Sequence, residues 1–431
     1  MVSHNKDVLW FALPFLAFAA AAPQMRMNES RDAEFARVPL NEWVAEGKPG
    51  SFKWSMHVAK PQLSVHQRLS SQVEVTIDGV ELAKRRGHGQ FLIFVQIRDA
   101  KDNVYRDLGN IDLEKVEEGV KASNIGFSDS AFFLPGDYRV DVALYATATK
   151  EHGVRKANLH VAPLAADPLA ASWRNLPPVE IRPVGEPPDS WYLPSVKGRV
   201  QFSTAPRQPL RIDLIANITP SESQSGSLRV QDRNLGFIIP ALKLLAQTEF
   251  KDSSLNVALM DLVRQRVTFK QENVDDLDWP TMRKSLAAAD PGVIDVKSLE
   301  NRRQNARFFL REINKRVGEK PSSRVLIIFS SAVAFDSGQD MEPLRLESPT
   351  DCHVYYIRFQ SEPARVFYGP ERPGSRGRRG PMPGQNVSLI SPEMDHLAPL
   401  LKALSPKVFD VKSAIEMRRA IASILNDIAA L

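Results

Sequence analysis

The side chains with the clearest potential for chemistry lie in a short loop after an apolar strand. The strand is predicted over 210–217, and Asn217, Thr219 and Ser221 follow at every second position. Mg²⁺ is usually held by one or two carboxylates together with water. Because position 217 carries an amide, the loop predicts a polar binding surface with no metal and no cofactor.

A second pair of hydroxyls, Ser330 and Ser331, directly follows the apolar run 324–329. Ligands of open parallel sheets bind outside the carboxyl ends of the strands. If the strands at 210–217 and 324–329 belong to one parallel sheet, both sets of side chains lie at the same edge. We therefore expect Asn217, Thr219, Ser221, Ser330 and Ser331 to form one binding site.

A basic segment is the other candidate for ligand contact. Residues 369–384 are rich in Gly and Pro and carry Arg376, Arg378 and Arg379. Such a composition favours a loop without packed side chains. Two interpretations stay open: the three arginines meet an anionic polymer or a phosphate, or the segment is a solvated insertion.

The elements that position these side chains are strands alternating with helices over 196–431. The strands are predicted near 210–217, 255–259, 266–270, 324–329, 353–359 and 407–411. Ser413 and Glu416 form a capping box that begins a final amphipathic helix. This alternation predicts an α/β domain with a doubly wound, mostly parallel sheet that is covered on both faces.

The N-terminal half has a different period. Over 61–163, apolar residues alternate with polar ones in short runs that end at turn residues, as at Val73, Val75 and Ile77 before Asp78-Gly79. This pattern predicts an antiparallel, immunoglobulin-like β-sandwich. Residues 23–60 are expected to form an extended lead-in, and the proline-dense segment 164–195 a semi-rigid linker.

The C-terminal region resembles a von Willebrand factor A domain in its strand order and in its ending, Lys407-Val-Phe-Asp-Val-x-Ser-Ala-Ile-Glu416. The resemblance implies a Rossmann-type fold and a metal-ion-dependent adhesion site. The positions of that site map to Asn217, Thr219 and Ser221, to Ser330-Ser331 and to a middle loop near 292–295. Two carboxylates and one hydroxyl are missing there, so the resemblance implies a degenerate site in an exported bacterial protein.

The N-terminus predicts export. Residues 1–22 have a polar start, an apolar stretch from Val8 and small residues at the end, as in a cleaved signal peptide. An uncleaved anchor is the alternative, and no later segment is apolar enough to span a membrane. The single cysteine, Cys352, excludes an intramolecular disulfide and is expected to be a buried thiol. We expect a periplasmic or extracellular protein.

Composition and motifs argue against several function classes. The net charge of +5 over 431 residues is mild and predicts no nucleic-acid partner. The sequence has no nucleophile elbow, zinc motif or phosphate-binding loop. The chain is therefore predicted to be a non-catalytic binding or scaffolding protein with an unidentified protein partner. The alternatives are a binder of an anionic envelope glycan or lipid through the arginine loop, and a metal-dependent adhesion protein.

Overall fold

The structure is a computed structural model, and it describes residues 33–182, 188–193, 199–219, 228–288, 302–318, 324–333, 351–360 and 395–431. The chain divides into two compact units. The first comprises Met1–Ala59, Val73–Asp129 and Asp137–His160, and the second comprises Lys60–Gln72, Ser130–Gly136 and Val161–Leu431. No helix among these described residues is both long enough and apolar enough to cross a membrane.

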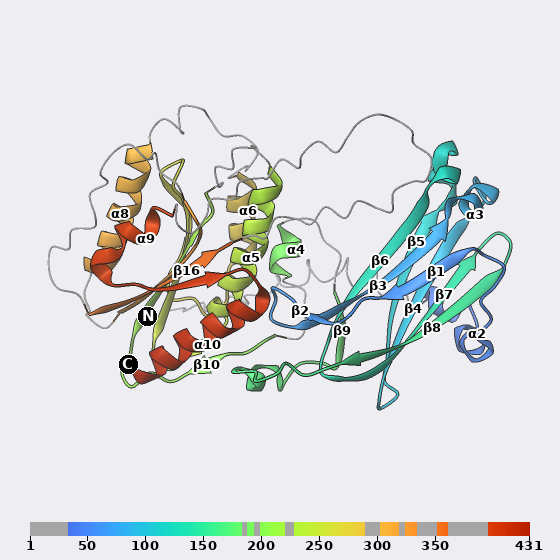
Figure 1. Cartoon of the computed structure of the whole chain (residues 1–431), viewed down its shortest axis with the longest axis horizontal. Coiled ribbons are helices and arrows are strands. Elements are labelled where there is room, and N and C mark those ends of the chain that lie inside the picture. Colours follow the sequence, from blue (N-terminus) through green and yellow to red (C-terminus); the bar gives the residue numbers. More distant parts are fainter. Residues whose placement is uncertain are drawn as a thin grey trace, which may run out of the picture. The chain divides into compact units, whose positions relative to one another are not determined.

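Antiparallel strands dominate the N-terminal half (Figure 1). One sheet has the order β1-β3-β6-β9 with β2 paired to β3, and another has the order β5-β4-β7-β8. The strands are β1 (Trp54–Val58), β2 (Gln62–Leu63), β3 (Leu69–Asp78), β4 (Gln90–Asp99), β5 (Val104–Asp112), β6 (Asn124–Phe133), β7 (Gly136–Ala146), β8 (His152–Val161) and β9 (Val179–Ile181). Short turns join most of them, which permits antiparallel pairing.

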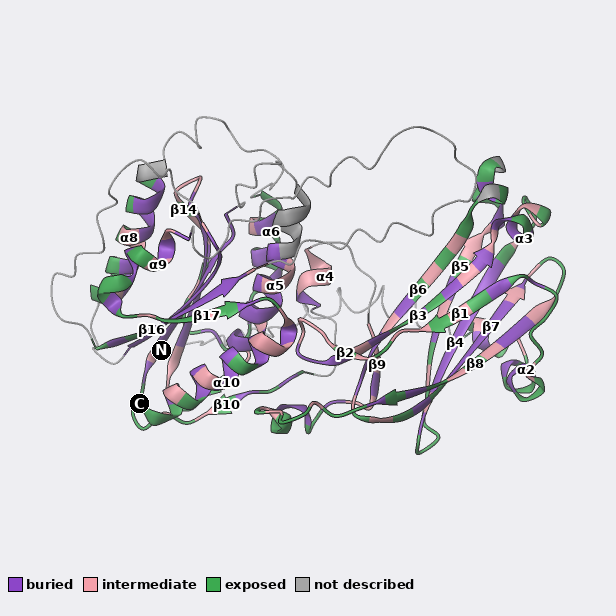
Figure 2. Cartoon of the chain, viewed as in Figure 1, coloured by how far each residue is buried: buried purple, intermediate pink, exposed green. Residues whose placement is uncertain are grey.

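Strand β4 is buried on both faces, which accounts for its continuous apolar run (Figure 2). Leu92 and Phe94 pack in a cluster with Phe35 and Trp43 from the segment that precedes β1. The sequence predicts an extended lead-in over 23–60, but the structure has a helix there, α2 (Leu40–Glu46), which covers this cluster. The helix ends at Gly47, whose φ of 64° gives the left-handed geometry common at helix ends.

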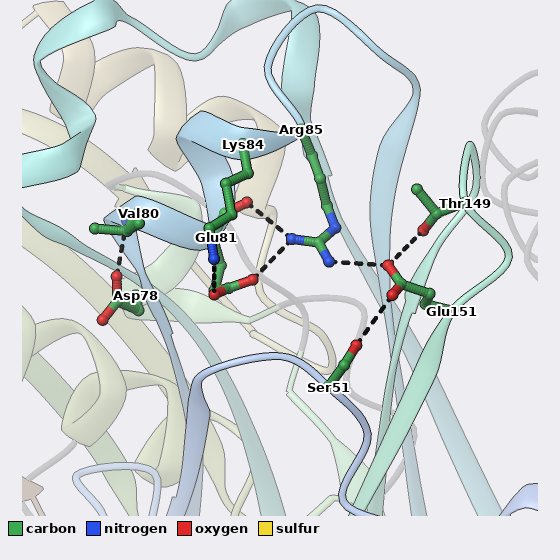
Figure 3. Close-up of polar contacts among 8 residues, drawn as sticks. All are labelled: Ser51, Asp78, Val80, Glu81, Lys84, Arg85, Thr149 and Glu151. Atoms are coloured by element: carbon green, nitrogen blue, oxygen red, sulfur yellow. Dashed lines mark hydrogen bonds and ion pairs between the residues drawn. The ribbon is translucent and has the colours of Figure 1, made fainter.

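An ion-pair network fixes the end of helix α3 (Gly79–Lys84) within the first unit (Figure 3). The Arg85 guanidinium donates 2.8 Å hydrogen bonds to Glu81 and to Glu151. Glu151 also accepts hydrogen bonds from the hydroxyls of Thr149 and Ser51. The arginine thus joins α3, the turn after β7 and the loop before β1.

The second unit contains a six-stranded sheet with the order β14-β13-β11-β15-β16-β17. Strand β11 pairs in parallel with β13 and β15, β15 with β16, and β16 with β17, while β14 pairs antiparallel with β13. The strands are β11 (Arg211–Asn217), β13 (Ser254–Asp261), β14 (Arg266–Gln271), β15 (Arg324–Ser331), β16 (Cys352–Phe359) and β17 (Lys407–Val411). A further pair, β10 (Ser203–Thr204) and β12 (Glu249–Phe250), is parallel.

Helices cover this sheet. Side chains of α8 (Arg302–Gly318) and α9 (Leu397–Leu400) share a core cluster with Ile215, Leu326 and Tyr356 of the strands. Helix α5 (Leu228–Ala246) lies on the opposite side from α8 and α9 in Figure 1. Helix α6 (Trp279–Ala288) contacts β14, and α10 (Ala414–Ala430) contacts β17. The helix α10 begins at Ser413, whose hydroxyl accepts the N–H of Glu416, so the predicted cap is confirmed.

The segment after β8 is held against α10 inside the second unit. Arg418, whose side chain is fully buried, donates hydrogen bonds of 2.6 and 2.8 Å to the two carboxylate oxygens of Asp167. Its guanidinium lies 4.6 Å from the ring centroid of Trp173. The Trp173 indole N–H in turn donates to the carbonyl of Gln67. This part of the predicted linker is therefore packed and buried at Trp173.

The predicted fold class is wrong. The chain is mixed, with 31% helix, 38% strand, antiparallel sheets and one mixed sheet, and its described residues show no clear doubly wound parallel sheet of the von Willebrand factor A type. The physical reason lies in the connections. A short turn at 262–265 folds β14 back antiparallel on β13, so the sheet that was predicted to be doubly wound over 196–431 is mixed.

Candidate functional site

The carboxyl ends of β11 and β15 lie side by side and carry the predicted polar residues. Ala216 is opposite Phe329 in the parallel register, so Asn217 and Ser330 are neighbours at this edge. Both are buried, with exposed fractions of 2% and 0%. The Asn217 side-chain amide donates a 2.9 Å hydrogen bond to the Ser330 hydroxyl oxygen. The structure thus brings together two side chains from distant parts of the sequence.

The other hydrogen bonds of this set also stay inside the protein. The side-chain carbonyl oxygen of Asn217 accepts the backbone N–H of Thr219, and the Thr219 hydroxyl oxygen accepts the backbone N–H of Leu262. The Ser330 hydroxyl donates to the carbonyl of Ser331. Asn217, Thr219, Ser330 and Ser331 are all buried, whereas Ser221 lies outside the described residues. These amide and hydroxyl groups connect strand ends and adjoining backbone.

Three charged side chains lie beside this edge, namely Arg358 of β16, Asp410 of β17 and Asp395 just before α9. Arg358 donates bidentate hydrogen bonds of 2.7 and 3.1 Å to Asp410 and a third of 3.2 Å to Asp395. Asp395 is fully buried, and its other oxygen accepts the N–H groups of Val333 and Leu397. Asp395 therefore holds the chain after β15, the start of α9 and Arg358 together.

Sequence reasoning missed Arg358, Asp395 and Asp410. One signal for Asp395 is its position two residues before the leucine-rich helix α9, because a carboxylate just before a helix accepts its first N–H groups. Arg358 has no such signal, since it lies inside strand β16 between the apolar residues Ile357 and Phe359. Its partner Asp410 is 52 positions away, and only the strand pairing of β16 with β17 brings them together.

Burial and these charges shift the pKa values at the edge. Burial of the Arg358 guanidinium lowers its pKa, but the hydrogen bonds and charges of Asp410 and Asp395 outweigh burial and raise it above the usual value. Complete burial raises the pKa of the Tyr356 phenol well above its usual value, and the nearby Asp395 carboxylate raises it further. Arg358 is therefore charged and Tyr356 neutral at physiological pH.

The described side chains do not form a metal site. No group of three or more His, Cys, Asp or Glu side chains in the described ranges is arranged to hold a metal ion. The oxygens of Asp395 are engaged by two backbone N–H groups and by Arg358. Burial raises the pKa of the Cys352 thiol to about 12, so this thiol stays protonated at the start of β16.

The arginine candidates Arg376, Arg378 and Arg379 lie outside the described residues. They belong to the connection from β16, which ends at Phe359, to α9, which begins at Leu397. That connection leaves the sheet at the same carboxyl edge as the connections after β11 and β15. The middle loop near 292–295 also falls outside the described part of the chain.

Comparisons with known proteins add no identification. No family model matches the chain, and no curated protein matches it. Among solved structures, the structural genomics target SoR45 has a TM-score of 0.18 and 10% identity, over 26% of this chain and 88% of that one. A Bordetella pertussis protein given the name ApaA has a TM-score of 0.18 and 15% identity, over 27% of this chain and 98% of that one.

A third solved structure is a β-glucosidase from Listeria innocua in complex with gluconolactone. Its TM-score is 0.15 at 13% identity, with 26% of this chain and 17% of that chain covered. Similarities this weak carry no argument about the fold or the activity of this chain.

Proposed function

We propose that this chain is an exported, non-catalytic binding protein whose partner protein docks on the connections at the carboxyl edge of the six-stranded sheet. The observation that carries this proposal is the buried Asn217–Ser330 hydrogen bond. In this hydrogen bond the two candidate polar side chains connect the ends of β11 and β15, so they are not available as catalytic groups. Binding residues are disproportionately found on loops that a rigid scaffold positions.

Three connections leave this rigid edge. They follow Asn217 of β11, Ser331 of β15 and Phe359 of β16, which are consecutive neighbours in the sheet. The ion pairs of Arg358 with Asp395 and Asp410 add a second anchor beside the third connection. A partner surface built on these connections needs no metal, no cofactor and no catalytic group.

The test is crosslinked capture from the envelope fraction with the full chain. We expect one protein partner, retained at 0.5 M salt and lost when residues 334–350 are replaced by a short Gly/Ser linker. Lys251→Ala is the matched control, because Lys251 is exposed and lies in the turn before β13, at the opposite end of that strand. Equal capture by both variants contradicts the proposal.

A second candidate function is binding of an anionic envelope polymer. It is favoured by Arg376, Arg378 and Arg379, which fall in the connection after β16. Salt screens the attraction between exposed charges, and the Debye length is about 10 Å at 0.1 M salt. Retention on heparin beads that decreases with salt and is lost when the three arginines become glutamines supports this candidate over the protein partner.

Export is tested separately. The proposed signal, residues 1–22, precedes the described part of the chain. We expect the full-length protein in the periplasm or the medium, and a chain that begins at residue 23 behind a new Met in the cytoplasm. The same location for both proteins contradicts this assignment.

A further inference from the structure

A small pocket in the second unit is lined by basic side chains from three distant segments. His66 and Arg68 come from the turn before β3, Arg199 from the segment before β10, and Lys243 from α5. The pocket has a volume of about 30 Å³. That space accommodates roughly two water-sized groups. Its size suits one small polar group rather than a whole metabolite.

Hydrogen-bond donors predominate in the polar lining of the pocket. Besides the four basic residues it includes the amide of Gln247, and none of the described residues that line it is acidic. Phe132 contributes an apolar wall, with the Arg68 guanidinium 4.7 Å from its ring centroid and His66 edge-on to the same ring. A guanidinium, an ammonium and an amide N–H together favour an oxyanion.

The carboxylates near these cations lie outside the lining. Arg68 forms an ion pair with the Glu180 carboxylate. Arg199 is half exposed, and its guanidinium is 3.8 Å from Asp276, too long for a strong ion pair. Lys243 donates hydrogen bonds of 2.8 and 2.9 Å to the backbone carbonyls of Tyr192 and Leu193. The acceptors of Lys243 are therefore neutral, and positive charge is in excess around the pocket.

The pKa values reflect this excess. Burial lowers the pKa of Lys243 to about 8, Arg199 and Arg68 lower it as well, and Glu180 and Asp276 oppose them. Burial lowers the pKa of His66 to about 3, with further lowering by Lys243, Arg182 and Arg68. His66 is therefore neutral at pH 7, although its hydrogen bond with the Ser190 backbone opposes the lowering of its pKa. An anion in the pocket would offset the crowding of cations.

We propose that this pocket binds a phosphate-sized oxyanion, either free or as the terminal phosphate of a larger ligand. Arg199 supplies a forked donor at the exposed side, Lys243 a point charge, and Gln247 a neutral donor. Because its contact with Asp276 is long and solvent-exposed, Arg199 exchanges that carboxylate for the ligand at little cost. This site is separate from the polar edge of the six-stranded sheet and independent of the function proposed there.

The experiment is calorimetric titration of the full chain with inorganic phosphate at low ionic strength. We expect saturable binding that Arg199→Gln and Lys243→Met each weaken by about 10-fold or more, because each removes a charged hydrogen-bond donor. Arg207→Gln, an exposed arginine in the same unit, should change the affinity less than twofold. Circular dichroism and melting curves establish that the variants are folded, and Arg199→Gln changes an exposed side chain.

Two further arms decide the ligand class. Acetate at equal ionic strength should bind at least 10-fold more weakly than phosphate, and glycerol 3-phosphate as tightly as phosphate if the site receives a terminal phosphate. Sulfate keeps its charge between pH 7 and 9.5, so its affinity should decrease as Lys243 deprotonates near pH 8, and Lys243→Met should lose that dependence. No saturable phosphate binding, or equal binding by the wild type and both variants, overturns the proposal.

Discussion

The side-chain amide of Asn217 donates a 2.9 Å hydrogen bond to the hydroxyl oxygen of Ser330, 113 positions later in the chain. This single contact joins the carboxyl ends of β11 and β15. Because its two members are buried and also bonded to nearby backbone, the contact is part of the scaffold.

Asn217→Ala should lower the free energy of unfolding by about 2–3 kcal/mol, because it leaves the buried Thr219 N–H without its acceptor. Ser330→Ala should cost less, about 1–2 kcal/mol, since it leaves one buried Asn217 amide N–H without its acceptor but keeps the Asn217–Thr219 bond. Urea unfolding followed by tryptophan fluorescence measures both. A loss from Ser330→Ala equal to that from Asn217→Ala would show that the Thr219 contact contributes nothing.

Divalent cations should leave the melting temperature unchanged. The Asn217 carbonyl oxygen and both oxygens of Asp395 already accept hydrogen bonds inside the protein. A Kd of roughly 10 μM would add about 2.7 kcal/mol at 1 mM metal, which a melting curve detects readily. The measurement uses Mg²⁺, Mn²⁺ and Ca²⁺ at 1 mM with an EDTA control. A metal-dependent shift that Asn217→Ala abolishes would revive the adhesion-site reading.

Arg358→Met should be strongly destabilising, by about 3 kcal/mol, because the Asp395 side chain is completely buried and loses its charged partner. The matched change is Asp410→Asn on the other side of the same arginine. Asp410 is 46% exposed, so its ion pair should contribute less than about 1 kcal/mol. The urea midpoints of the two variants are compared with that of the wild type. Similar losses of stability would mean that burial of Asp395 does not increase the contribution of its ion pair.

Asp167→Asn should destabilise the protein by about 3 kcal/mol at pH 7, because it leaves the fully buried Arg418 guanidinium without its carboxylate partner. Burial raises the pKa of Asp167, but the Arg418 hydrogen bonds outweigh it and lower that pKa below 3.8. The stabilisation is therefore complete above pH 3.8 and is lost as the pH falls through the lower, folded-state pKa.

The difference in the free energy of unfolding between the wild type and Asp167→Asn should therefore become smaller below about pH 3.8. Unfolding measured from pH 7 to pH 2.5 tests this. Asp252→Asn, an exposed carboxyl in a turn of the same unit, serves as the control and should follow the wild type throughout. A difference that is constant over the whole range would exclude the Arg418 pair as its source.

The sequence by itself determined the local elements. Apolar runs predicted the strands that end at Asn217 and Phe359. The Ser413 cap begins α10 as predicted. The thiol of Cys352 is buried as well. These features depend on propensity, capping and local hydrophobic period, which act over a few residues.

Only the tertiary structure decided which strands pair and what the polar residues touch. With β14 antiparallel to β13 the sheet is mixed, whereas strand–helix alternation predicted a doubly wound, mostly parallel sheet. Arg358 and Asp410, or His66 and Lys243, meet because chain segments far apart in sequence pack together. Such contacts depend on pairing and packing energies summed over the whole unit, so no local pattern in the sequence encodes them.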